Sequence, residues 1–134
     1  MDSLAKAKRE GLIRAHGISS HSDAATELAA ETEWCDVVHV CINNAGIRMD
    51  GPQGDPATLE KAVRATKKAY AAGKGVLAMK VVGEGRLDAQ QRKESTKFVM
   101  DTNSVHTMFI GFTEKEQITE FVNNVNAIKA VVSS

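Results

Sequence analysis

The chain has 134 residues, enough for one ordinary domain and too few for two of average size. Its 43% hydrophobic and 25% charged residues are typical of a globular protein and argue against a disordered, collagen-like or coiled-coil chain. Seventeen basic residues balance seventeen acidic ones, so the zero net charge provides no general attraction to nucleic acid or to anionic membranes.

The first part of the chain predicts two helices and one strand. Helical character over Asp2–Glu10 ends at Gly11, since glycine commonly terminates a helix. The apolar, β-branched run Leu12–Ile18 predicts the first strand. The Ala-, Leu- and Glu-rich stretch Ser22–Glu31 predicts a second helix that begins beside Ser22.

The middle of the chain repeats this order of strand and helix. The run Asp36–Ile42 predicts the second strand, and Ala57–Ala72 carries apolar residues at close to helical spacing. Pro56 lies near the first turn of that helix, where proline is favoured, and Gly73 follows its last turn. The run Gly75–Val82 then predicts the third strand.

The last part of the chain predicts two helices around one strand. A short helix is expected over Gln90–Met100 and the fourth strand over Val105–Ile110. Glu114–Val131 places its apolar residues on one face with a period of 3.6, which predicts a final helix. Thr113 and Glu116 have the spacing of a capping box at its start.

Four strand–helix repeats after one helix predict parallel strands joined by right-handed crossovers. Most of the strands are continuous apolar runs, as in sheets covered on both faces. The mean repeat is about 33 residues, near the size of one βαβ module. A closed eight-unit barrel needs roughly 250 residues. Two folds therefore remain open, a small open α/β sheet and half a barrel.

Polar residues follow the carboxyl end of each predicted strand, the edge at which parallel α/β folds bind ligands. These uncharged and glycine-rich clusters suit amide, ribose or phosphate recognition, although each one alone is also typical of an ordinary turn. The clusters are Ser19-Ser20-His21, Asn43-Asn44-Ala45-Gly46, Lys80 with Gly83-Glu84-Gly85, and Gly111-Phe112-Thr113.

Two cysteines, Cys35 and Cys41, lie in apolar surroundings and are expected to be small buried residues in a reducing compartment. His39 and Cys41 share a strand face, but the sequence offers no further metal ligands near them. The chain has no apolar run of membrane length, and its first residues do not form a signal peptide. These features predict a cytoplasmic protein.

The other three histidines differ in their expected environments. His16 alternates with strand residues and is expected to be hydrogen-bonded rather than a base. His21 follows the first strand and is the best-placed histidine for ligand contact. His106 falls inside the fourth strand and is expected to be packed.

Four stretches of the chain carry, in order, the patterns of one known family. The first runs from a basic helix end through Gly-Leu-Ile-Arg to the strand end Gly-Ile-Ser-Ser, and the third joins a strand to a glycine-containing loop. The stretches are Lys8–Ser20, Asp36–Asn43, Gly75–Leu87 and Thr107–Ile118. They resemble the fifth to eighth strands of the aldo-keto reductases, in particular bacterial members, and cover essentially the whole chain.

The resemblance implies that residues 1–134 form one domain, the C-terminal half of a (β/α)8 TIM barrel. The family's catalytic Asp, Tyr, Lys and His come from the first four units, which have no counterpart here, so no catalytic residue is expected. Lys80 and Tyr70 do not replace them, because Lys80 belongs to a different strand and Tyr70 to a predicted helix. The start at Met1 is expected to reflect a truncated reading frame or an excised fragment.

What remains by resemblance is the half that binds NADP or NAD. Ser19 and Ser20 match the positions that hold the nicotinamide carboxamide, and His39 stands where a glutamine usually binds the same amide. Met79 stands where an aromatic ring usually stacks on the nicotinamide. Gly83 and Gly85 match a loop that approaches the pyrophosphate, and Gly111, Phe112 and Thr113 match the adenosine-phosphate segment. The remaining predicted cofactor-binding residues are Asn43, Lys80 and Gln117.

The clamp for the 2′-phosphate of NADP is not evident. At the start of the last helix the chain offers Glu114, Lys115, Glu116 and Gln117, and two carboxylates near a phosphate are unfavourable. Strong selectivity for NADPH is therefore not expected.

Three hypotheses follow. The first is an aldo-keto-reductase-like oxidoreductase fragment, inactive alone and acting on a small carbonyl substrate only within a complete barrel. The second is a non-catalytic half barrel that forms homo-oligomers through its exposed strand edges and binds a nucleotide or phosphate. The third, a small flavodoxin-like domain, is disfavoured because the chain opens with a helix. It also remains open whether the chain alone binds any cofactor.

Overall fold

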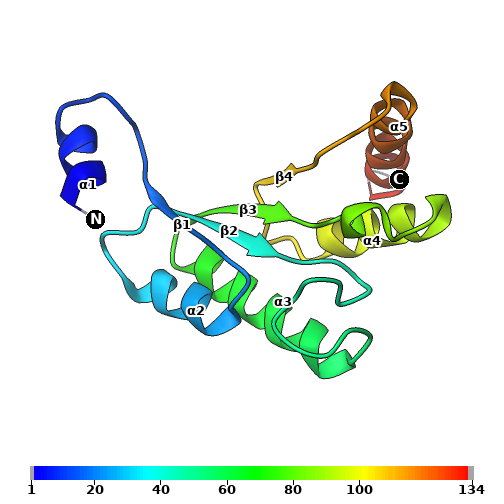
Figure 1. Ribbon diagram of the computed structural model, residues 1–134, viewed down its shortest axis with the longest axis horizontal. Helices are drawn as coiled ribbons and strands as arrows, with labels where there is room; N and C mark the ends of the chain where they lie inside the picture. The colour runs from blue at the N-terminus through cyan, green and yellow to red at the C-terminus, as the bar shows by residue number, and fades with distance from the viewer. Residues whose placement is uncertain (1, 133–134) are drawn as a thin grey trace.

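The structure is a computed structural model that describes residues 2–132 (Figure 1). It confirms the predicted alternation of helices and strands. The elements are α1 (Asp2–Arg9), β1 (Gly17–Ser20), α2 (Asp23–Glu31), β2 (Val37–Cys41), α3 (Pro56–Ala71), β3 (Gly75–Met79), the 3₁₀ turn η1 (Gly83–Gly85), α4 (Ala89–Asp101), β4 (Thr107–Phe109) and α5 (Lys115–Val132).

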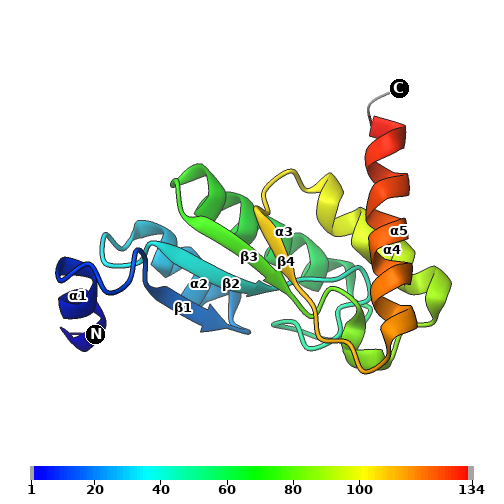
Figure 2. The same ribbon diagram turned by 90° about the horizontal axis from the view of Figure 1, so that it is seen from above.

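The four strands form one parallel sheet in the order β1-β2-β3-β4. Since each strand pairs with the next one in the chain and parallel crossovers keep one hand, the connecting helices must lie on the same face. Figure 2 shows this arrangement, with α2, α3 and α4 behind the strands and no described helix across the front of the sheet. The chain is thus an α/β domain consistent with half a barrel, and the open sheet with helices on both faces does not form in the described residues.

The core lies between the sheet and these three helices. Val38 and Val40 of β2 and Val76 and Ala78 of β3 point toward the helices and are almost completely buried. Small residues such as Ala69 on the helices allow close approach to the sheet. Each fully buried valine of this kind stabilises the fold by about 1.5–3 kcal/mol.

Two predicted helix starts are confirmed. The Ser22 side chain caps α2 by accepting a hydrogen bond from the backbone N–H of Ala25. Pro56 stands in the first turn of α3, and the preceding Asp55 caps the helix by accepting from the N–H of Ala57. These caps anchor the helices that follow β1 and β2.

Two other helix starts differ from expectation. The capping box predicted between Thr113 and Glu116 does not form. Instead, the N–H of Thr113 donates to Oε1 of Gln117 at 3.0 Å, and α5 begins at Lys115. A capping box that the sequence analysis missed joins Asp88 and Gln91 at the start of α4. At the start of α5 the side chain of Gln117 reaches back to the N–H of Thr113, so Glu116 is not needed to accept that hydrogen bond.

The two edge strands are shorter than predicted, and β1 shares only Gly17 and Ile18 with the predicted run. β3 ends at Met79 rather than at Val82. β2 begins at Val37, whose partner on β1 is Gly17, so the residues from Leu12 to His16 have no strand beside them. Leu12 is accordingly 74% exposed. His106 precedes β4 and is exposed rather than packed inside it, with its ring stacked on Tyr70 at 4.9 Å. An extended segment needs a paired neighbour, which the apolar pattern alone does not reveal.

Candidate functional site

A cavity of about 570 Å³ lies at the carboxyl ends of β3 and β4, between the loops that follow these strands and α5. This is the edge at which parallel α/β sheets bind ligands. Nine of the twelve predicted cofactor-binding residues line it: Ser19, His39, Met79, Lys80, Gly85, Gly111, Phe112, Thr113 and Gln117.

The floor of the cavity is the side of the sheet that no described helix covers. The Ser19 hydroxyl points to the sulfur of Met79 at 3.7 Å, across the intervening strand β2. The rings of His39 and Phe109 are tilted with their centroids 5.8 Å apart. An apolar floor that carries one hydroxyl and one imidazole can hold a planar ring and hydrogen-bond to a polar group on it.

The other wall of the cavity, beyond the carboxyl ends of the strands, is formed by the segment after β4 and by α5. Phe112 and Phe121 pack with ring centroids 5.8 Å apart. The amide of Gln117 is occupied by Thr113, whose N–H donates to Oε1. Gln117 therefore positions the start of α5 and offers less of its amide to a ligand than the sequence analysis expected.

An ion pair that the sequence analysis missed joins α4 to α5 at the cavity. Arg92 donates two hydrogen bonds to the carboxylate of Glu120, at 2.7 and 2.6 Å, and a third to the carbonyl of Leu87 at 2.8 Å. The Arg92 hydrogen bonds hold the pKa of Glu120 below its usual range. Charged helix residues usually face solvent, so the sequence carries no signal for a pair separated by 28 positions.

A second charged group borders the cavity on the loop after β3. The carboxylate of Glu84 lies between the ammonium of Lys80 and Nε of Arg48, the latter at 3.0 Å. The hydrogen bond from Lys80, followed by that from Arg48, lowers the pKa of Glu84. All three residues have positive φ, at 63°, 55° and 59° for Lys80, Glu84 and Arg48. Such strained backbone tends to gather at functional sites. An anion that recruits Lys80 must compete with Glu84.

Three predicted residues lie outside the lining, and two of them, Ser20 and Gly83, belong to loops beside the cavity. The Ser20 hydroxyl accepts a hydrogen bond from the N–H of Ser22 at 2.9 Å and so belongs to the turn before α2. Gly83 has a φ of 65°, and a Cβ there would come within 2.6 Å of the Leu87 side chain. Both positions shape the loops beside the cavity rather than its surface.

Asn43 is the third predicted residue outside the lining. It is completely buried, its Oδ1 accepts from the N–H groups of Ala45 and Ile47, and its Nδ2 donates to the carbonyl of Ile47. These three hydrogen bonds hold the turn after β2. The side chain replaces backbone partners that the turn cannot supply.

We expect Asn43→Ala to lower the free energy of unfolding by about 3 kcal/mol, because buried N–H and C=O groups lose their partners. Urea denaturation followed by circular dichroism measures the change. The control is Asn44→Ala, at a neighbour whose side chain makes no hydrogen bond in the described structure. Equal losses in the two variants would contradict this role.

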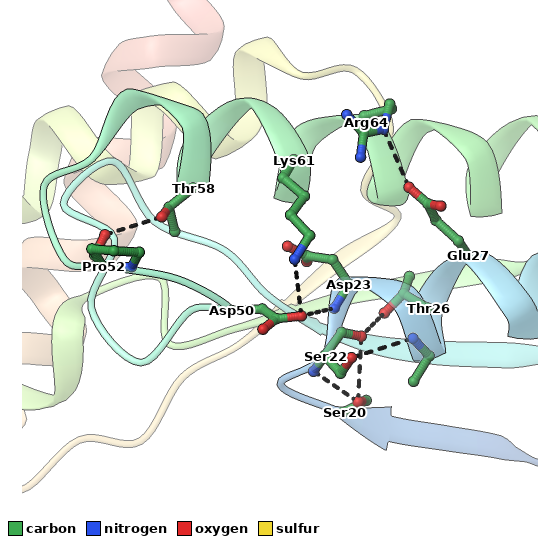
Figure 3. Close-up of polar contacts among 11 residues, drawn as sticks. Ser20, Ser22, Asp23, Thr26, Glu27, Asp50, Pro52, Thr58, Lys61 and Arg64 are labelled. Carbon is green, nitrogen blue, oxygen red and sulfur yellow. Dashed lines mark hydrogen bonds and ion pairs between the residues drawn. The ribbon is translucent and has the colours of Figure 1, made fainter.

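A second polar cluster lies on the helix side of the sheet, outside the cavity (Figure 3). Asp23, in the first turn of α2, is 7% exposed, and its Oδ2 is buried without a hydrogen-bond partner. Oδ2 of Asp50 accepts from the N–H of Asp23 at 2.9 Å and lies 3.4 Å from Nζ of Lys61. Burial, followed by the charge of Asp50, raises the pKa of Asp23 to about 6.

The remaining predicted residues have mostly structural surroundings. Nδ1 of His21 lies 2.6 Å from the carbonyl of Arg48, so this histidine ties two loops together. His16 stacks on Trp34 with centroids 4.4 Å apart. Cys35 and Cys41 are free and buried as predicted, and burial raises the pKa of Cys41 to about 12. Residues 2–132 hold no group of three or more His, Cys, Asp or Glu side chains arranged for a metal ion.

Comparisons with protein-family models, with curated proteins and with solved structures found no match to this chain. Within the described residues, every helix is too short or too polar to cross a membrane.

Proposed function

We propose that the chain is the nicotinamide-dinucleotide-binding half of an aldo-keto-reductase-like (β/α)8 barrel. One observation carries the proposal. Residues that the family resemblance assigns to cofactor binding come from four separate segments of the chain, and nine of them surround one cavity. The resemblance requires these four segments to meet at the ligand-binding edge of the sheet, and they do so around a single cavity.

The lining fits the parts of such a cofactor. Ser19 and His39 would hold the carboxamide, and the Met79 thioether would pack against the nicotinamide ring. The backbone N–H groups of Gly111 and Phe112, just before α5, would face the phosphates. When bound, the cofactor supplies a hydride to a carbonyl substrate.

The charges around the cavity favour NAD over NADP. Lys80 and Arg92, two cations that line the cavity, are already neutralised by Glu84 and Glu120. A 2′-phosphate adds two further negative charges close to these carboxylates and gains no free cation in the lining.

Chemistry on a carbonyl needs a proton donor as well as a cofactor. The lining contains no tyrosine, and each of its two cations is paired with a carboxylate. We therefore propose that the chain alone does not turn over a substrate and that a carbonyl is reduced only in a complete barrel. The proposed setting is the cytoplasm, where NAD(H) is available.

Calorimetric titration with NADH and with NADPH tests the proposal. We expect NADH to bind at least as tightly as NADPH, and Ser19→Ala to weaken binding of NADH about fivefold through the loss of one hydrogen bond. Ser3→Ala, which removes a hydroxyl from α1 far from the cavity, is the matched control and should bind as the wild type does. The proposal fails if neither nucleotide binds, or if Ser19→Ala binds as tightly as the control.

A non-catalytic half barrel that holds a nucleotide or phosphate is the second candidate. The pairing of the cations in the cavity favours it, since this pairing leaves no charged group free for acid–base work. Titration with AMP separates the two candidates. Binding of AMP as tight as that of NADH would favour the second, because AMP lacks the nicotinamide.

A further inference from the structure

One face of the sheet is open to solvent in the single chain. Strand side chains alternate between faces, so the register identifies the set that points away from the helices. Within the described strands this set contains no Asp, Glu, Lys or Arg, and one member, Phe109, is 67% exposed. Its members are Gly17, Ser19, Val37, His39, Gly75, Leu77, Met79, Thr107 and Phe109, whereas Cys41 is buried beside Met49 of the loop after β2. We call it the open face.

Both outer strands of the sheet also have unpaired backbone groups. Gly75 donates to the carbonyl of Asp36 and Ile42 donates to that of Met79, so Val76 and Ala78 are the β3 residues whose backbone groups face β4. In the β3–β4 register these groups meet the backbone groups of Thr107 and Phe109, so Met108 between these two directs its backbone groups away from β3. The outer edge of β1 is unpaired in the same way, because β1 has only β2 beside it. Such edges readily pair with another strand.

The chain exposes more surface than a compact monomer of its size. Its accessible surface is 7984 Å², whereas a folded monomer of 14.4 kDa exposes roughly 6,800 Å². The excess is about 1,100 Å², and α1 and α5, which project beyond the sheet in Figure 2, supply part of it. A standard protein interface covers about 800 Å² of each partner. The excess is therefore large enough to include an interface, and the uncharged open face has the apolar character of one.

We propose that a second copy of this chain covers the open face. The two copies would be related by a twofold axis parallel to the strands, so that β1 of each copy lies beside β4 of the other. Rotation about that axis preserves strand direction, and the eight strands would all be parallel. Eight is also the number of strands at which inward side chains just fill a closed barrel.

This arrangement has a consequence for the cavity. Ser19, His39 and Met79 belong both to the open face and to the cavity floor. A second copy would exclude water from that floor and complete the site from its open side. The inference rests on the sheet alone and holds whichever ligand the cavity binds.

Light scattering coupled to size-exclusion chromatography tests the inference. We expect the wild-type chain to form a monodisperse dimer of about twice 14.4 kDa. Met108→Pro removes one N–H that points to the proposed seam and no hydrogen bond to β3, so it should weaken the dimer at least tenfold. Met108→Val keeps the N–H and should remain dimeric.

A second variant guards against misfolding at position 108. Phe109→Glu places a charge on the open face, and we expect a monomer with an unchanged circular dichroism spectrum. A wild-type monomer at about 100 µM, a polydisperse aggregate, or a dimer insensitive to both Met108→Pro and Phe109→Glu would overturn the inference. Because the readout is mass without nucleotide, its failure is distinct from a failure to bind NADH.

Discussion

Alanine at position 17 is expected to separate β1 from the sheet and to lower the free energy of unfolding by at least about 3 kcal/mol. A Cβ on Gly17 would lie 1.7 Å from the carbonyl oxygen of Val37, its partner in the β1–β2 register. No rotamer change relieves this clash, because the opposing atom belongs to the backbone. Urea denaturation measures the loss, and hydrogen exchange should show that protection is lost first in β1 and β2.

Gly111→Ala is the matched control for this effect. A Cβ at Gly111 meets nothing within 4 Å, and the residue does not have a positive φ. Its stability should change by less than about 0.5 kcal/mol. If Gly17→Ala were as stable as Gly111→Ala, the close approach of β1 to β2 would be wrong.

The order of elements followed from the sequence because each signal was local. Ser22 and Pro56 mark helix starts through their own chemistry, and these predictions are confirmed. The lengths of β1 and β4 depend on the neighbouring strands and could not be predicted from local sequence. Leu12 belongs to an apolar run, yet it stays outside the sheet because β2 begins too late to pair with it. The periodicity of one strand cannot reveal where its neighbour begins.

The cavity shows the same division between local and long-range information. Strand ends were predictable, and their polar residues gather at one edge because parallel strands all end there. The partners of charged groups were not predictable, since Arg92 meets Glu120 through the packing of α5 on α4. Asn43 was assigned to the cofactor for its position, whereas its hydrogen bonds serve the turn. A polar residue at a strand end can contact a ligand or stabilise a turn, and its hydrogen-bond partners in the structure show which role it has.

A single carboxyl group is expected to make the stability of this domain depend on pH. The pKa of Asp23 rises from 3.8 to about 6 in the folded chain. Burial is the largest cause, followed by Asp50 on the loop before α3, while Glu27 on α2 adds to the rise. Lys61 and Arg64 on α3 oppose it without compensating (Figure 3).

The sign of the effect follows from proton linkage. The folded state holds this proton more tightly than the unfolded state, so the group does not oppose folding below pH 4. As the pH rises from about 4 to 6, the unfolded chain ionises first and the folded state loses relative stability. Above pH 6 the full cost applies, up to about 3 kcal/mol for a shift of about two pKa units.

Asp23→Asn should therefore stabilise the protein at pH 8 by up to about 3 kcal/mol and leave its stability at pH 4 nearly unchanged. The amide cannot ionise, and no side-chain hydrogen bond is lost because Asp23 makes none in the described structure. Urea denaturation at both pH values measures the difference. Asp2→Asn removes an exposed carboxylate from the first turn of α1 and should change little at either pH. A difference between wild type and Asp23→Asn that is the same at pH 4 and pH 8 would show that the carboxyl of Asp23 stays hydrated. The loop that carries Asp50 would then not close over α2 as the structure describes.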